Sequence, residues 1–370
     1  MKSLSVFLLL AGWSITAFAQ QVPVIRATSK TVSIKDGPTF MKNTWTIEPE
    51  TKPDIYRTSA KKVVFYTDVD SISVHVKPGQ QQDFYILLNG KDSALTRVEF
   101  QPSRLEMLKK AKKYNYADKR ELPAFTYLSP DDEALKRIRR ELKLDSIAGS
   151  GNEISQMINL MHWVHDIIRH DGSSNNPAVR NAIGIIDVCN KEKRGVNCRM
   201  MATVLNECYL AMGFKSRFLT CMPKELKFDD CHVINMVYST EKQKWVWMDP
   251  TFNAYVMNEK GEVLGPQEVR ERLINGQTLI VNPDANWNRK NSAVKEQYLD
   301  NYMAKNLYRL ESSAASGYDQ ETQQAGKWLT YVQLVPLDGL NQQNTKSENL
   351  KWNSYKTLIT NNPDVFWAKP

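Results

Sequence analysis

The sequence predicts an α+β protein with a small antiparallel β domain at the N-terminus, a core of helices and strands, and a C-terminal extension. Apolar and polar residues alternate over residues 71–77, which is the pattern of a strand with one buried and one wet face. Apolar residues recur at helical spacing after Cys198, and three β-rich segments follow between residues 216 and 248. Together these elements predict the α+β class.

The first 19 residues have the three parts of a secretory signal peptide. Lys2 supplies the positive charge, residues 6–15 form the apolar stretch, and Ala17 and Ala19 flank Phe18 in a small-x-small cleavage site. Neither this apolar run nor any later stretch is long enough to span a bilayer. We therefore expect no membrane span and a periplasmic or secreted protein.

The length of 370 residues predicts two or three structural units, and the formal net charge is +8. Positive charge gathers between Lys109 and Arg120, inside a segment at 106–129 that we expect to be a linker. A basic segment with interleaved tyrosines is also typical of sites for acidic polymers or nucleic acid. Because an exported protein rarely meets nucleic acid, we expect no nucleic-acid partner, and an envelope polymer is the remaining anionic candidate.

The N-terminal β domain is expected over residues 20–105. A second alternating stretch at 84–88 is followed by Asn89-Gly90, the strongest short-range hairpin signal, and then by a returning strand at 94–100. The domain carries no motif with recognisable chemistry. We therefore consider that it docks the protein to a partner or presents substrate to the larger domain.

A larger domain is expected over residues 130–280, with the C-terminal extension at 281–370. Acidic residues open a helix at about 130–144, and an apolar stripe marks a second helix at about 152–168. After these come an expected polar loop at 172–190, helices near 266–275 and 293–311, a strand at 327–336 and a loosely ordered tail from 340.

The second of these helices carries His162 and His165, and His170 follows it, which raises the question of a metal site. No two of these histidines stand four residues apart, the spacing of a helical zinc pair. Asp166 does stand four residues after His162, but two ligands on one helix face are a weak signal. We expect neither a metal nor any other cofactor.

Export permits disulfides, and the five cysteines are an odd number, so at least one thiol stays free. Cys221 and Cys231 lie in neighbouring predicted strands and are candidates for pairing. The alternative, that Cys189, Cys208 and this pair are all buried free thiols, has equal support.

Cys198 begins the predicted helix directly after the turn Gly195-Val196-Asn197. Gly213 stands where a helix C-cap glycine belongs and marks the end of the same helix. Unpaired backbone N–H groups and the positive end of the dipole at a helix N-terminus favour an anion. A thiol there loses its proton more easily, and the thiolate is the nucleophile.

His232 begins the second β-rich segment and Asp249 ends the third. Because the start of one strand and the end of the next lie at the same edge of an antiparallel hairpin, these two side chains can meet. The carboxylate can then accept a proton from one ring nitrogen and leave the other to face a thiol, as in a catalytic triad.

Taken in order, these residues resemble the transglutaminase-like superfamily over about residues 150–256. The resemblance rests on Gly195, Cys198, Gly213, Arg217, His232, Trp245, Trp247, Asp249, Pro250 and Thr251. It implies a papain-like α+β fold for the domain at 130–280, which would be the catalytic domain. It also implies a triad with Cys198 as nucleophile, His232 as base and acid, and Asp249 as the residue that orients the histidine.

Two positions depart from the family pattern. Ile234 stands where an aromatic residue is usual, and Arg199 follows the cysteine where a small or aromatic residue is common. For the oxyanion hole, the backbone N–H of Cys198 is the natural first donor. The resemblance to animal transglutaminases suggests Trp163 as a second donor, although its helix is expected to belong to the core.

These expectations describe an exported cysteine-dependent amide or peptide hydrolase, or acyltransferase, that forms a thioester. Cross-linking requires a dry site in which an amine outcompetes water, and the sequence does not show such a channel. The resemblance to bacterial members of the family, which are often hydrolases, favours hydrolysis. The expected partner is a peptide or protein substrate of the cell envelope. The alternatives are an inactive module that binds envelope peptides or glycans, and a binder of anionic polymers through the basic segment.

Overall fold

The computed structural model describes residues 22–50, 52–111, 113–228, 230–338 and 345–370. Two compact units divide the chain between Pro102 and Ser103. The signal peptide expected over residues 1–19 lies outside the described residues. Within the described ranges, no helix has both the length and the apolar character needed to cross a membrane.

The N-terminal unit consists of two four-stranded sheets, ordered β1-β7-β8-β4 and β3-β2-β5-β6. The strands are β1 (Val24–Ala27), β2 (Thr31–Asp36), β3 (Thr39–Thr46), β4 (Asp54–Thr58), β5 (Lys62–Tyr66), β6 (Ser71–His75), β7 (Gln81–Leu88) and β8 (Asp92–Phe100). The sheets share one core, in which Phe65 and Phe84 pack with ring centroids 5.0 Å apart.

Most neighbouring strands of this unit are antiparallel, whereas β1 and β4 join their sheet parallel to β7 and β8. The hairpin of β7 and β8 turns at Asn89 and Gly90, whose φ angles of 53° and 68° suit a tight hairpin turn. The predicted antiparallel β structure at the N-terminus is therefore confirmed, with parallel strands added at its edges.

The second unit is built around a seven-stranded sheet, ordered β12-β11-β10-β17-β19-β21-β20. The strands are β10 (Ser216–Met222), β11 (His232–Ser239), β12 (Lys244–Met248), β17 (Arg309–Ser313), β19 (Lys327–Leu334), β20 (Thr345–Glu348) and β21 (Asn353–Thr360). Val246 and Trp247, neighbours in β12, belong to core clusters on opposite sides of the sheet. Both faces are thus covered, which explains why β10 to β12 are buried almost throughout.

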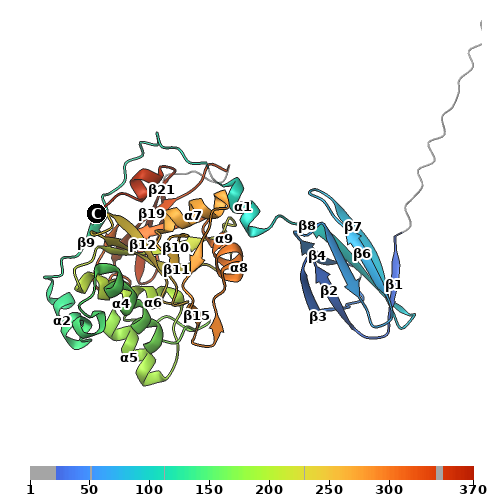
Figure 1. The fold of residues 1–370 in the computed structure, drawn as a ribbon, viewed down its shortest axis with the longest axis horizontal. Helices are drawn as coiled ribbons and strands as arrows, with labels where there is room; N and C mark the ends of the chain where they lie inside the picture. The colour runs from blue at the N-terminus through green and yellow to red at the C-terminus, as the bar shows by residue number, and fades with distance from the viewer. Residues whose placement is uncertain (1–21, 51, 112, 229, 339–344) are drawn as a thin grey trace, which may run out of the picture. The chain divides into compact units, whose positions relative to one another are not determined.

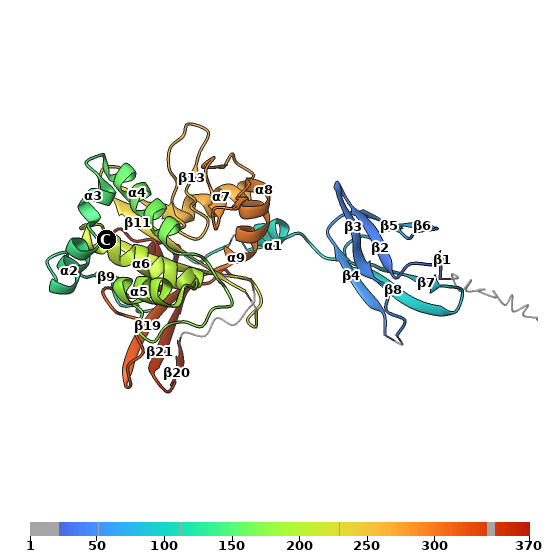
Figure 2. The ribbon, with the colours of Figure 1, turned by 90° about the horizontal axis from the view of Figure 1, so that it is seen from below.

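Helices cover the sheet on both faces. One layer, gathered on one side of the strands in Figure 1, contains α2 (Glu133–Glu141), α3 (Leu144–Ala148), α4 (Glu153–Ile167), α5 (Ala182–Glu192) and α6 (Cys198–Ala211). The other core cluster contains residues from α1 (Arg104–Lys110), α7 (Pro266–Asn275), a π-helix η1 (Tyr298–Met303), α9 (Ala304–Asn306) and α10 (Pro363–Phe366). This arrangement, seen from below in Figure 2, confirms the predicted α+β class.

The remaining elements are short and connect this framework. They are β9 (Thr126–Tyr127), β13 (Val256–Met257), β14 (Ile280–Val281), β15 (Asn286–Trp287), β16 (Asn291–Ser292), α8 (Lys295–Gln297) and β18 (Ala315–Ser316). Among them, β15 and β16 form a hairpin that reaches the candidate site described below.

Three predictions about individual elements were wrong. The expected loop at 172–190 contains most of α5, whose N-cap Asn181 accepts the N–H of Gly184 at 2.9 Å. The helix expected at 293–311 is broken into α8, η1 and α9, and it ends at Asn306 before β17. The tail expected to be loose contains β21, which pairs in parallel with β19 over its whole length. Pairing with a distant strand supplies order that local composition does not reveal.

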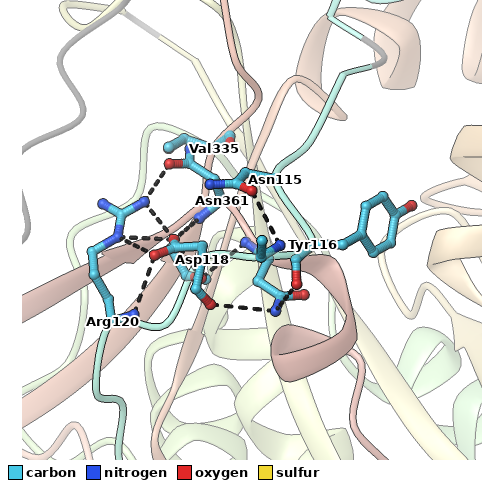
Figure 3. Close-up of polar contacts among 9 residues, drawn as sticks. Asn115, Tyr116, Asp118, Arg120, Val335 and Asn361 are labelled. Carbon is cyan, nitrogen blue, oxygen red and sulfur yellow. Dashed lines mark hydrogen bonds and ion pairs between the residues drawn. The ribbon is translucent and has the colours of Figure 1, made fainter.

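The segment expected as a linker, 106–129, is packed onto the second unit. Leu108 of α1 is fully buried. Asp118 forms an ion pair with Arg120 at 2.5 Å and accepts the backbone N–H of Asn361, which follows β21, at 2.8 Å (Figure 3). Hydrogen bonds from the Arg120 side chain and from the backbone N–H groups of Asn361 and Arg120 lower the pKa of Asp118 to about 2. Part of the basic segment is therefore engaged in an internal network.

Candidate active site

Cys198 is the first residue of α6, and the turn before it is tightly constrained. Asn197 caps the helix by accepting the backbone N–H of Met200 at 3.2 Å. Gly195 has no room for a side chain, because a Cβ there would lie 2.4 Å from the carbonyl oxygen of Arg169. The Cys198 side chain remains partly exposed. Its backbone N–H, at the start of the helix, has no acceptor within the helix.

His232 and Asp249 lie together at the edge of the β11–β12 hairpin. His232 is the first residue of β11, and Asp249 directly follows β12. The distance from His232 Nε2 to Asp249 Oδ2 is 2.7 Å, and the two side chains are 1% and 0% exposed. Because the carboxylate holds Nε2, Nδ1 is the nitrogen left for Cys198, whose pKa is lowered by its interaction with this ring.

The carboxylate of Asp249 accepts four hydrogen bonds. Oδ2 accepts from His232 and from the hydroxyl of Tyr298, the latter at 2.6 Å. Oδ1 accepts the backbone N–H groups of Thr251 at 2.9 Å and Phe252 at 3.2 Å. These bonds fix the carboxylate, so it can orient the histidine ring.

The π-helix η1 brings two tyrosines, Tyr298 and Tyr302, to this pair. Tyr298 accepts a hydrogen bond from the indole N–H of Trp247 at 3.2 Å while it donates to the carboxylate. The ring of Tyr302 lies 5.3 Å from that of His232, and Phe252 lies 5.5 Å from it. π-Helical turns are frequent at functional sites. Aromatic rings on two sides shield the histidine from water.

Opposing effects set the charge of the thiol and the imidazole. Burial raises the pKa of Cys198, but hydrogen bonds from His170 and His232, together with the positive charge of His232, lower it to about 6. Burial likewise lowers the pKa of His232, but the charge and hydrogen bond of Asp249, together with the thiol, raise it to about 10. Between these values the geometry favours a thiolate–imidazolium pair.

His170 is the residue of this site that sequence reasoning missed. Its ring interacts with the Cys198 thiol and lowers the pKa of that thiol. Its Nδ1 accepts the indole N–H of Trp287 at 3.1 Å. It lies in an isolated parallel bridge with Val196, two residues before the cysteine. His170 stands 28 positions before Cys198 in the sequence, and no motif there suggested more than a weak metal site.

The other upstream candidates lie elsewhere. Trp163 is partly buried in α4 and packs against the helical core. His165 is buried, with one ring nitrogen 2.9 Å from the carbonyl oxygen of Pro250 and the other 3.0 Å from the side-chain oxygen of Asn286. His162 lies 3.5 Å from Asp284. Across the described ranges, no group of three His, Cys, Asp or Glu side chains is arranged to hold a metal ion.

Only Cys198 has the environment of a reactive thiol. Burial is the main influence on the other four cysteines, and it raises the pKa of each of them: Cys189, Cys208, Cys221 and Cys231. All five cysteines are free in the structure, so Cys221 and Cys231 follow the free-thiol alternative.

A polar cavity of about 400 Å³ begins at the residue after the cysteine. Arg199 forms an ion pair with Glu321 at 2.5 Å and lies 5.2 Å from the ring of Phe218. The far wall comes from the C-terminal strands and includes Tyr355, which packs against the same apolar cluster as Cys198. Strands from the expected C-terminal extension thus help to form the surroundings of the site.

A second cavity, of about 360 Å³, lies on the histidine side of the site. It is lined by Phe252, Tyr298 and Tyr302, which surround the His232–Asp249 pair, and by Trp287, which contacts His170. Two cavities of different character, one polar and one aromatic, are therefore lined by residues that neighbour the cysteine and its histidines.

Comparisons with known proteins identify the region that carries these residues. Residues 140–250 match the sequence model of the transglutaminase-like superfamily. No curated protein matches the chain.

Several solved structures are similar to parts of this chain. A candidate cysteine protease from Cytophaga hutchinsonii is 19% identical, with a TM-score of 0.26; the match covers 31% of this chain and 37% of that one. LapG of Legionella pneumophila is 12% identical over 37% of this chain and 75% of its own, with a TM-score of 0.25. Red sea bream transglutaminase is 11% identical over 66% of this chain and 51% of its own, with a TM-score of 0.26. The chain thus spans little more than a third of the Cytophaga protein.

Proposed function

Because residues 140–250 form a transglutaminase-like domain, we propose that this chain is an exported cysteine-dependent amide or peptide hydrolase, with acyl transfer as a related activity. In this proposal Cys198 is the nucleophile, His232 the base and acid, and Asp249 the residue that orients it. The observation that carries the proposal is the 2.7 Å contact between His232 Nε2 and Asp249, which leaves Nδ1 for the thiol. The low pKa of Cys198 supports the same roles.

The first half of the reaction forms a thioester. The Cys198 thiolate attacks the carbonyl carbon of the substrate amide, and the carbonyl oxygen becomes negatively charged. The carbon–nitrogen bond then breaks as the imidazolium of His232 gives its Nδ1 proton to the leaving amine. The acyl group remains on the sulfur, and His232 is left neutral.

The second half releases the acyl group. Neutral His232 takes a proton from water at Nδ1 while the water oxygen attacks the thioester carbon. The carbon–sulfur bond breaks, the carboxylic acid leaves, and the thiolate–imidazolium pair is restored. An amine in place of the water would give a new amide instead.

Water is the favoured acceptor. An amine wins only where the site excludes water, and Cys198 is partly exposed. Polar walls beside Arg199 and aromatic walls beside His232 suit a peptide with mixed side chains. With the signal peptide expected at the N-terminus, we propose a peptide or protein of the cell envelope as the substrate class.

The proposal can be tested by the reactivity of the thiol. The purified chain, without residues 1–19, is treated with iodoacetamide at pH 6.5–7, where an ordinary thiol is mostly protonated. We expect rapid labelling of one cysteine, lost in Cys198→Ala and strongly slowed in His232→Ala. Cys208→Ala is the matched control, because this buried thiol should not label.

A positive result leads to a peptide-library search, scored both for cleavage and for incorporation of a fluorescent amine. More cleavage than incorporation would support hydrolysis as the main reaction. Labelling of Cys198 no faster than that of a free thiol would refute the enzyme proposal and favour the binding module.

A further inference from the structure

We propose that His170 is the second donor of the oxyanion hole and acts together with the backbone N–H of Cys198. This inference depends on the proposed function, because an oxyanion forms only when the thiolate attacks a carbonyl. It replaces the expectation that Trp163, which packs in the helical core, would serve as this donor.

The backbone of His170 is held on both edges. On one edge, the carbonyl oxygen of Arg169 accepts the N–H of Val196 at 3.1 Å, and the N–H of Asp171 donates to the Val196 carbonyl at 2.8 Å. On the other edge, the side chain of Asn288 accepts the His170 N–H at 2.7 Å and donates to its carbonyl at 3.0 Å. The segment therefore has a fixed register beside the cysteine turn.

The ring of His170 is held in one tautomer. The indole of Trp287 is a donor only, so Nδ1 of His170, which accepts from it at 3.1 Å, carries no proton. The proton of the neutral ring is then on Nε2, the nitrogen left for Cys198. In this tautomer Nε2 of His170 is a hydrogen-bond donor to the site and not an acceptor.

His232 has the opposite arrangement. Its Nε2 is bonded to the carboxylate of Asp249, which stabilises a charged ring and leaves Nδ1 to exchange protons. In the described part of the chain, no carboxylate is hydrogen-bonded to His170. The two histidines that contact one sulfur thus differ in their partners, a carboxylate for the base and an indole for the donor.

The position of the donor matches the charge that develops. The oxygen that becomes negative is bonded to the carbon that Cys198 attacks, so it lies two bonds from the sulfur. A donor beside the sulfur is therefore within reach of that oxygen. The other donor, the backbone N–H of Cys198, belongs to the residue that carries the sulfur. Two fixed donors, in a site partly closed to water, are the usual composition of an oxyanion hole.

Two probes of the same thiol test this role. Iodoacetamide alkylates a thiolate by displacement and forms no oxyanion, whereas p-nitrophenyl acetate acylates it through a tetrahedral oxyanion. Both rates are measured at the pH-independent plateau, so changes in the thiol pKa cancel. We expect His170→Ala to lower the acylation rate by about 10²–10³-fold and to leave the alkylation rate nearly unchanged.

Three further variants complete the test. His170→Gln retains an N–H donor and should recover most of the acylation rate. Trp287→Phe frees the ring tautomer and should cause a smaller loss, and Trp163→Phe should have no effect. Circular dichroism confirms that each variant is folded.

The outcomes separate the two proposals. Equal losses of both rates in His170→Ala, or no loss of acylation, would overturn the donor role while the enzyme proposal stands. Slow alkylation of the unmodified protein would contradict the enzyme proposal itself. Loss of acylation in Trp163→Phe but not in His170→Ala would return the role to the tryptophan.

Discussion

Tyr298 donates a hydrogen bond of 2.6 Å to Asp249 Oδ2, the same oxygen that accepts from His232. The tyrosine also accepts the indole N–H of Trp247 at 3.2 Å. The carboxylate is therefore held by a chain of buried donors that extends from the sheet to η1. Together with the backbone N–H groups of Thr251 and Phe252, which donate to Oδ1, this chain fixes the orientation of Asp249.

Replacing Tyr298 with Phe should reduce both activity and stability. Loss of one charge-assisted hydrogen bond to Asp249 should lower the acylation rate of Cys198 roughly tenfold. The indole N–H of Trp247 becomes buried without an acceptor, which should cost about 1–3 kcal/mol of unfolding free energy. Acylation by p-nitrophenyl acetate and urea denaturation measure the two effects.

The matched control is Tyr302→Phe. Its hydroxyl makes only long contacts, of 3.4 Å, to Asp230 and to the carbonyl of Cys231, while its ring packs against His232. Removing the hydroxyl should have little effect. Equal losses in the two variants would show that the chain through Tyr298 has no special role.

Asp249→Asn should change the pH at which the thiol ionises. The carboxylate charge raises the pKa of His232, and positive charge on His232 in turn lowers the pKa of Cys198 to about 6. Without that charge the imidazole loses its proton at lower pH. The midpoint of the alkylation rate against pH should then rise from about 6 by at least about one pH unit.

In the unmodified protein, the alkylation rate should increase through pH 6 and then stay level. Turnover should fall again only as His232 loses the proton that it gives to the leaving amine, towards pH 10. An unchanged alkylation midpoint in Asp249→Asn would mean that the His232–Asp249 contact does not control the thiol.

The contact between His232 and Asp249 could be predicted because it depends on local structure. Strands β11 and β12 are joined by a short turn, so the hydrophobic pattern alone fixes which residues meet at the edge. Cys198 could be placed for a similar reason, because helix caps and periodicity are local signals.

His170 and Tyr298 could not be predicted in this way. The position of His170 depends on a bridge to Val196 and on Asn288, 118 residues further along the chain. Tyr298 contacts Asp249 from the first position of the π-helix η1, and apolar periodicity does not distinguish such a turn from a regular helix. The order of the polar tail also depends on long-range pairing, because β21 pairs with β19.

Gly195→Ala should disrupt the cysteine turn. A Cβ at this position would lie 2.4 Å from the carbonyl oxygen of Arg169 and 2.8 Å from the Asp171 side chain. The segment that carries His170 would have to move away, at a cost of about 1–3 kcal/mol of unfolding free energy. We expect a lower melting temperature and a larger loss of acylation than of alkylation.

Gly172→Ala is the control on the same segment. A Cβ there would meet only the His170 ring, at an ordinary contact distance of 3.6 Å, and should be tolerated. If Gly195→Ala melted and reacted like the unmodified protein, the close approach of these two segments would not be required.

Glu207 should make the protein less stable as the pH rises. This carboxyl is buried in α6, where Oε2 accepts the N–H of Ala182 and Oε1 that of Asp319. Burial outweighs these bonds and raises its pKa to about 8. Between pH 4.5 and 8 the folded state therefore holds a proton that the unfolded state has lost. The stability contributed by protonation is present below pH 4.5 and is lost as the pH rises through 8.

Glu207→Gln carries no titrating group at this position, so its melting temperature should fall less between pH 5 and 8 than that of the unmodified protein at the same ionic strength. Parallel melting curves for the two proteins would show that Glu207 is already ionised in the fold, and that the backbone N–H groups of Ala182 and Asp319 stabilise the charge.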